Sequence, residues 1–91
     1  MSRNITHNSA QQRFEWLEDG ALSVIEYELN GDVLKLVHTE VPEAVGGRGI
    51  ASDLARHALE TARSKGWKVL PACDYVATYI KRHPQYQDIV A

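Results

Sequence analysis

Hydrophobic and polar residues alternate with period two on both sides of Asn30-Gly31, in the stretch "ALSVIEYELNGDVLKLVHTEV". This alternation predicts two antiparallel strands, because successive side chains of a strand point to opposite faces. Asn-Gly is the dipeptide most typical of a two-residue hairpin loop. With that loop, Tyr27 is expected opposite Leu34, and Ser23 opposite His38. One face is then apolar near the turn and ionisable further along, and it comprises Ile25, Tyr27, Leu34, Leu36, His38 and Glu40.

The rest of the chain divides into short strands and two main helices. From Ile50 the apolar residues recur at helical spacing, and Gly66 is a typical helix stop. The stretch "YVATYIKR" predicts a second helix, which Asp74 can cap. Further strands are expected at Ile5–Asn8, Arg13–Leu17 and "WKVLPAC", and the tail "QYQDIVA" is expected to dock by Tyr86 and Ile89. This order predicts an α+β fold with a mostly antiparallel sheet and one strand–helix–strand crossover.

Composition narrows the class of protein without choosing a function. A chain of 91 residues is expected to form one domain, residues 1–91. A net charge of -2 does not support nucleic-acid binding, which needs a basic face. The single cysteine, Cys73, excludes an internal disulfide and suits a reducing cytoplasm. No apolar run has the length of a membrane span, and no signal peptide is recognised. We expect a soluble cytoplasmic domain without a metal site, either a monomer or a weak dimer.

Three glycines, Gly46, Gly47 and Gly49, are grouped around Arg48 at the start of the first predicted helix. A helix start has N–H groups without intrahelical partners and carries partial positive charge. Glycines let a bulky anion approach these groups, so the loop suits a pyrophosphate. A Walker A loop would need Lys followed by Ser or Thr, and a dinucleotide fingerprint would need glycine at Ser52. A plain flexible turn is the alternative.

Two stretches together resemble a known family. The stretch "VPEAVGGRGIA" resembles the acetyl-coenzyme A loop of the GNAT superfamily of N-acetyltransferases, and "PACDYVATYIKRHPQY" resembles a later segment of its very small, single-domain members. The resemblance covers residues 22–86. It implies a GNAT-like fold and transfer of acetyl from acetyl-CoA to an amine by direct attack. A CoA-binding module without turnover and a protein-interaction domain are the alternatives.

The resemblance also implies where the cofactor lies. Backbone N–H groups of the glycine loop would hold the pyrophosphate, and an N–H near Val41 would polarise the thioester carbonyl. Arg48 would add positive charge, whereas Gly46 replaces the family's usual Gln or Arg and removes one side-chain contact. Tyr79 is nearest to the tyrosine that protonates the leaving thiolate, although its apolar stripe favours core packing. The predicted cofactor-binding residues are Val41, Gly46, Gly47, Arg48, Gly49, Ile50, Ala51 and Tyr79.

The predicted catalytic residues are His38, Glu40 and Cys73. An attacking amine must lose a proton, so a general base or a water chain is required. His38 and Glu40 lie at the polar end of an otherwise apolar strand face; a half-buried His38 held by Ser23 is the alternative. Cys73 precedes a helix start, where a thiolate is favoured, and is expected near the thioester; a small buried hydrophobe is its alternative role. The helical insertion that lines the acceptor site in larger relatives is absent, so the acceptor amine is left open.

Overall fold

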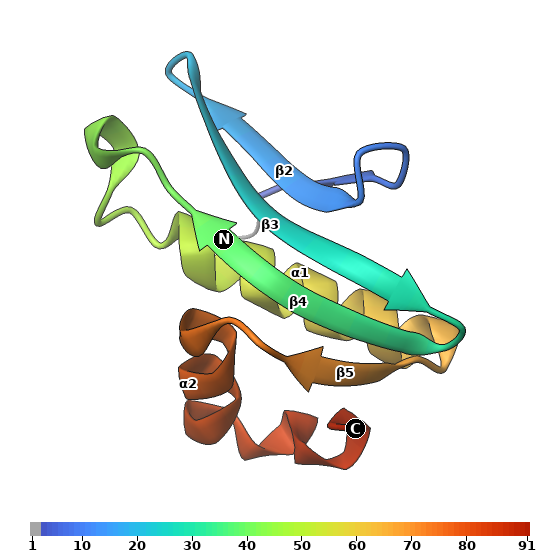
Figure 1. Ribbon diagram of the computed structural model, residues 1–91. Helices are drawn as coiled ribbons and strands as arrows, with labels where there is room; N and C mark the ends of the chain where they lie inside the picture. Colours follow the sequence, from blue (N-terminus) through green and yellow to red (C-terminus); the bar gives the residue numbers. More distant parts are fainter. Residues whose placement is uncertain (1–2) are drawn as a thin grey trace.

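The protein is built on one five-stranded sheet with the strand order β1-β2-β3-β4-β5 (Figure 1). The computed structural model describes residues 3–91. The strands are β1 (Thr6–Asn8), β2 (Arg13–Glu18), β3 (Ala21–Asn30), β4 (Val33–Glu40) and β5 (Lys68–Pro71). Neighbours from β1 to β4 are antiparallel, and β5 joins β4 in parallel. The predicted α+β class with a mostly antiparallel sheet is confirmed.

Two α-helices accompany the sheet. Helix α1 (Ile50–Lys65) makes the crossover from β4 to β5 and passes behind the sheet in Figure 1. It ends as expected at Gly66, whose φ of 73° is left-handed and whose N–H reaches the last carbonyls of the helix. Helix α2 (Asp74–Arg82) follows β5, and short 3-10 turns, η1 (Glu43–Val45) and η2 (Pro84–Ile89), precede α1 and end the chain.

The start of α2 differs from the prediction by one residue. Cys73, not Asp74, is the N-cap, because its backbone is extended (φ -88°, ψ 130°) while Asp74 is already helical. Asp74 is instead the acidic residue of the first turn, where it interacts favourably with the helix dipole. The thiol of Cys73 is therefore placed directly at the helix start.

The core lies between α1 and the sheet. Phe14, Ile25, Leu34 and Leu36 from the strands are fully buried, and α1 buries its predicted face. Tyr86 and Ile89 are also buried, which confirms that the tail docks by these residues. Among residues 3–91, no helix has both the length and the apolar character needed to cross a membrane. The α1 residues in the core are Ile50, Leu54, Ala55, Ala58, Leu59 and Ala62.

The β3–β4 hairpin has a different register from the one predicted. Asn30 pairs with Val33, so the two-residue loop is Gly31-Asp32 and not Asn30-Gly31. Gly31 has a φ of 62°, and glycine at the first central position is typical of a II′ turn. Tyr27 consequently lies opposite Leu36 rather than Leu34. A shift by two residues preserves the faces, so the apolar face made by these side chains is confirmed.

An irregularity further along the hairpin overturns the placement of His38 and Glu40. The register shifts beside Glu26 and Tyr27, whose partners are His38 and Leu36, so Val37 is the extra residue of a β-bulge. Beyond the bulge Ile25 lies opposite Thr39, and Thr39 therefore faces the core. His38 and Glu40 lie on the other face of the sheet. The prediction is wrong because period-two alternation does not continue across a bulge. The extra residue moves every later side chain to the opposite face.

Candidate functional site

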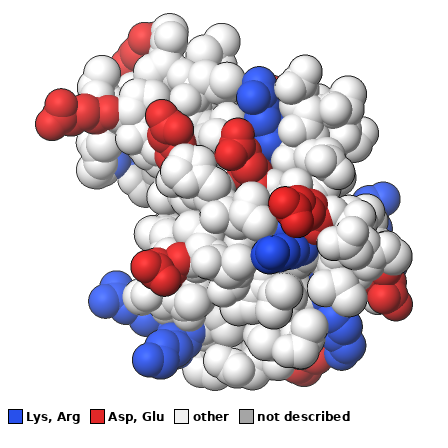
Figure 2. Space-filling view, viewed as in Figure 1, with Lys and Arg blue, Asp and Glu red and all other residues white. Residues whose placement is uncertain are grey.

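The end of β4 has an unpaired edge. β5 accompanies β4 only from Val33 to Leu36, where Leu36 pairs with Pro71. The N–H of Cys73 then donates to the Leu36 carbonyl over 2.9 Å, and the chain turns away into α2. Among residues 3–91, no strand lies beside residues 37–40 of β4 on the β5 side. The surface is notched at this place, between the end of β4 and the start of α2 (Figure 2). A free strand edge offers N–H and C=O groups to an extended ligand.

The glycine loop adopts backbone angles that other residues avoid. Gly47 and Gly49 have φ values of 76° and 80°, and a Cβ atom at either would meet nothing within 4 Å. Glycine at these two positions thus permits the left-handed conformation, and the absence of a side chain leaves the loop surface open. Gly46 is different: its φ is -66°, and a Cβ there would lie 3.3 Å from the Glu43 carbonyl. The shape of the loop therefore depends on the left-handed angles of Gly47 and Gly49.

The start of α1 presents donors without protein partners. The first hydrogen bond of the helix runs from the Asp53 N–H to the Gly49 carbonyl, over 3.1 Å. Within residues 3–91, no hydrogen bond is found for the N–H groups of Ile50, Ala51 and Ser52, and Gly49 provides no side-chain cap. Such groups and the helix dipole together suit an anion. The donors lie at the same end of the molecule as the free edge of β4, since the loop connects the two.

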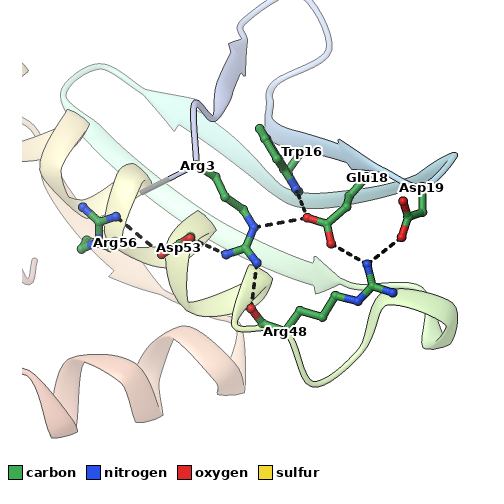
Figure 3. A network of polar contacts seen from close by, with 7 residues as sticks. All are labelled: Arg3, Trp16, Glu18, Asp19, Arg48, Asp53 and Arg56. Carbon is green, nitrogen blue, oxygen red and sulfur yellow. Dashed lines mark hydrogen bonds and ion pairs between the residues drawn. The ribbon is translucent and has the colours of Figure 1, made fainter. Parts of the chain in front are cut away.

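Arg48 does not face this set of donors. Its guanidinium donates to Glu18 over 2.6 Å and to Asp19 over 2.7 Å, both at the β2–β3 turn (Figure 3). Its carbonyl accepts from Arg3 over 2.7 Å. The predicted role of Arg48 as free positive charge beside a phosphate does not agree with this geometry, because two carboxylates already neutralise it. Sequence reasoning missed Glu18, whose partner lies 30 positions away.

Cys73 and Thr39 meet at the inner side of the β4 edge. Their Sγ and Oγ1 atoms lie 3.3 Å apart. Burial raises the pKa of the Cys73 thiol, but the Thr39 hydroxyl and the N–H groups of Val76 and Tyr75 stabilise the thiolate, and the net pKa lies below the usual value. Cys73 is partly buried and packs against the edge of the core, so its thiol combines a core contact with a lowered pKa. The bulge was needed to bring Thr39 to this position.

The acidity of Cys73 gives a first test. We expect the pH profile of iodoacetamide alkylation, followed by mass spectrometry, to rise at lower pH than for an ordinary thiol, because the thiolate reacts and Cys73 is the single cysteine. Thr39→Val removes a hydroxyl that stabilises the thiolate, so the pKa should increase and the rate at pH 7 should fall. Thr61→Val on α1 is the control. Superimposable profiles for wild type and Thr39→Val would exclude this role of Thr39.

His38 and Glu40 form a separate pair on the outer face. Their Nε2 and Oε1 atoms lie 3.4 Å apart, and the side chains are 54% and 67% exposed. Ser23 does not hold His38, because Ser23 pairs with Trp16 and its hydroxyl, fully buried on the inner face, has no partner. His38 pairs instead with Glu26. The predicted catalytic residues thus divide between two sides of one strand, with the thiol inside and the imidazole outside.

Tyr79 belongs to the packing between α2 and its surroundings. It is 7% exposed and stacks on His83 with ring centroids 3.9 Å apart. Burial raises the pKa of Tyr79, and the Ser52 hydroxyl at the start of α1 offsets part of that effect. Ser52 also interacts with Tyr75, which is exposed. The geometry therefore favours core packing as the role of Tyr79. The Tyr79 hydroxyl nevertheless lies near Ser52, at the loop end of α1.

Comparison with known proteins gives the family of this chain. A family model described as GCN5-related N-acetyl-transferase matches residues 13–89. The chain belongs to this family. The resemblance inferred from the two sequence stretches is thereby confirmed.

The chain is similar in sequence to vertebrate proteins and in fold to a bacterial one. Protein NATD1 of Mus musculus is 35% identical over 83 residues, which cover 88% of this chain and 76% of that protein. Protein NATD1 of Danio rerio is 34% identical over 87 residues, with 90% and 79% covered. A solution structure of a GCN5-like protein from Staphylococcus aureus superposes with a TM-score of 0.75 at 24% identity, covering 97% of this chain and 87% of that one. The last match confirms the GNAT-like fold.

Proposed function

We propose that this GCN5-related protein transfers acetyl from acetyl-CoA directly to an amine. The observation that carries the proposal is the junction of the free β4 edge with the unpartnered N–H groups at the start of α1. One part suits an extended, amide-containing chain and the other suits a pyrophosphate. Acetyl-CoA has both parts in that order. The family membership supports the same assignment.

The backbone carries most of the cofactor binding in this proposal. The N–H groups of Gly47, Gly49, Ile50 and Ala51 hold the pyrophosphate, and the edge of β4 up to Val41 pairs with the pantetheine arm. A backbone N–H near Val41 polarises the thioester carbonyl, and one such donor contributes about 3–4 kcal/mol to transition-state stabilisation. The side chain of Arg48 is left out of this set, because it is paired with carboxylates.

The amine reaches the thioester from the face of the sheet opposite α1. His38 and Glu40 are exposed on that face, and acidic side chains gather over it (Figure 2). Glu26 and Glu40 form no ion pair with Lys or Arg among the described residues, so a cationic amine is attracted there. His38 accepts the proton that the ammonium must lose before attack. Cys73 lies on the other side of β4 and contacts the thioester end of the cofactor.

Binding and turnover are tested separately. Isothermal titration of the protein with acetyl-CoA should show one site, and absence of binding at millimolar ligand would exclude any cofactor role. Release of free CoA thiol with a panel of primary amines should then show turnover. A protein that binds acetyl-CoA but releases no thiol with any amine would favour a non-catalytic CoA-binding module. The core packing of Tyr79 is the observation in favour of that second function.

The role of His38 gives a further prediction. His38→Ala should lower kcat for the best amine about 100-fold, because a general base contributes at least that much, while acetyl-CoA affinity stays unchanged. The measurement is the steady-state rate of thiol release together with a calorimetric titration. Glu28→Gln is the control, since Glu28 lies on the same β3–β4 hairpin but pairs with Lys35 nearer the turn. An unchanged kcat would assign proton removal to another group.

A further inference from the structure

We infer that Glu18 is a positioning residue for the cofactor: it holds Arg48 and Arg3 and thereby sets the backbone of the 46–49 loop in its anion-binding shape. The inference rests on the proposed function and adds to it a residue that touches no part of acetyl-CoA. It replaces the assignment of Arg48 as a phosphate ligand. The relevant contacts are drawn in Figure 3.

Glu18 is the centre of the network. One carboxylate oxygen accepts from the Trp16 indole N–H over 2.8 Å and lies 3.5 Å from the Arg3 guanidinium. The other accepts from Arg48 over 2.6 Å. Hydrogen bonds from Trp16 and Arg48 lower the pKa of Glu18 to about 2, so the carboxylate is charged throughout the physiological range. The Glu18 carboxylate thus contacts Arg48 in the loop and two neighbours of the loop network, Arg3 and Trp16.

The β2–β3 turn is shaped to make these contacts. Asp19 and Gly20 have φ values of 53° and 75°, and Glu18 pairs with Ala21, which together define a tight two-residue hairpin loop. This turn places the Asp19 carboxylate beside that of Glu18, and the Arg48 guanidinium donates to both. Glu18 and Arg48 are 30 positions apart in the sequence, and the whole β3–β4 hairpin lies between them. These contacts join the loop to the β2–β3 hairpin.

Contacts hold both the side chain and the backbone carbonyl of Arg48, and the position of Arg48 in the loop makes these contacts important. It lies between Gly47 and Gly49, which are the residues with the greatest backbone freedom. The Arg48 side chain is fixed by carboxylates, and its carbonyl is fixed by Arg3. Arg3 also pairs with Asp53 in the first turn of α1, so the loop and the helix start share one support. Without these contacts, the freedom of two glycines would have to be lost upon cofactor binding.

The test compares two ligands that differ in the pyrophosphate. Acetyl-CoA contains the pyrophosphate that the loop holds, whereas S-acetylpantetheine contains only the arm that lies along β4. We expect Glu18→Gln to weaken acetyl-CoA binding about tenfold, because charge-assisted hydrogen bonds are lost, and to leave S-acetylpantetheine binding unchanged. Amide chemical shifts of Gly47 and Gly49 in the free protein should change as well. Binding of both ligands is followed by NMR titration.

A second variant separates positioning from direct charge. Arg48→Lys keeps the positive charge, but the lysine side chain is one bond too short to bring its ammonium to the position of Arg48 Nη1, the atom that donates to both Glu18 and Asp19. Under our inference it weakens acetyl-CoA binding as Glu18→Gln does. If Arg48 were a phosphate ligand, Glu18→Gln would free its charge and strengthen binding, and Arg48→Lys would nearly preserve it. Either of these results overturns the inference, as does an equal loss for S-acetylpantetheine.

A matched control and the wild type complete the experiment. Asp88→Asn breaks a comparable bidentate pair with Arg63, 3.0 Å for each contact, toward the other end of α1. This variant should bind both ligands as the wild type does, and a tenfold loss here would show that any surface ion pair has the same effect. Wild-type protein that fails to bind acetyl-CoA would refute the proposed function. Wild-type binding with an unaffected Glu18→Gln variant would refute this inference alone.

Discussion

Gly49→Glu is expected to abolish acetyl-CoA binding while the protein remains folded. A carboxylate at this position would lie beside the pyrophosphate, and two like charges about 4 Å apart repel by about 4 kcal/mol in a partly buried environment, or roughly 1000-fold in affinity. The substitution also blocks approach to the N–H groups of Ile50 and Ala51. Isothermal titration with acetyl-CoA measures the loss, and circular dichroism measures the fold.

Gly31→Glu is the matched control for this variant. Gly31 has a φ of 62° and nothing within 4 Å of an added Cβ, so it shares the strain and the openness of Gly49 but lies at the far hairpin turn. The left-handed conformation costs both variants about 1–2 kcal/mol of stability. If both variants lost acetyl-CoA affinity equally, the effect would come from general destabilisation. If neither did, the cofactor would not be bound at the loop.

Phe14→Ala is expected to lower the free energy of unfolding by about 3–5 kcal/mol, the usual range for removing a large aromatic side chain from a core. Phe14 is fully buried and has aromatic neighbours on several sides, with ring centroids 4.3 Å from His7 and 5.6 Å from His57. It connects β1, β2 and α1. Native domains have about 5–15 kcal/mol in total, so this loss is a large fraction of the stability.

Leu17→Ala, on the same strand as Phe14, tests whether the loss of stability depends on burial or on hydrophobicity alone. Leu17 is 64% exposed, and its replacement should change the free energy of unfolding by no more than about 0.5 kcal/mol. Urea denaturation of both variants gives the comparison, with the slope m as a check on two-state behaviour. Similar losses for Leu17→Ala and Phe14→Ala would mean that the core does not lie between this strand and α1.

The division of candidate residues across β4 has a consequence for the chemistry. His38 and Glu40 face outward, and Cys73 faces inward with Thr39. Under the proposed function, a base on the outer side serves the incoming amine, while the thiol on the inner side lies close to the pantetheine arm of acetyl-CoA. The pH profile of alkylation and the kinetics of His38→Ala therefore probe different steps. In the proposed direct attack, His38 of the outer pair accepts the proton and the Cys73 thiolate forms no covalent intermediate.

Local patterns in the sequence predicted most of the fold. Helical spacing from Ile50 and the stop at Gly66 depend on residues within a few positions of one another, and both are confirmed. The glycine loop was likewise predicted from neighbouring residues, because a strand, a turn and a helix start follow directly along the chain. The family resemblance was carried by the same contiguous stretches and is confirmed by the family model. These features are set by short-range rules of backbone geometry.

Only the tertiary structure decided the contacts between segments that lie far apart in the sequence. A bulge at Val37 turns His38 and Glu40 outward and Thr39 inward, and period-two alternation carries no signal for one extra residue. Thr39 reaches Cys73 across 34 positions, and Arg48 reaches Glu18 across 30. Such pairs form because packing of α1 on the sheet fixes strand register and turn position together. The sequence by itself thus predicted an anion at the helix start, and the folded sheet decided which side chains contact the loop beside it.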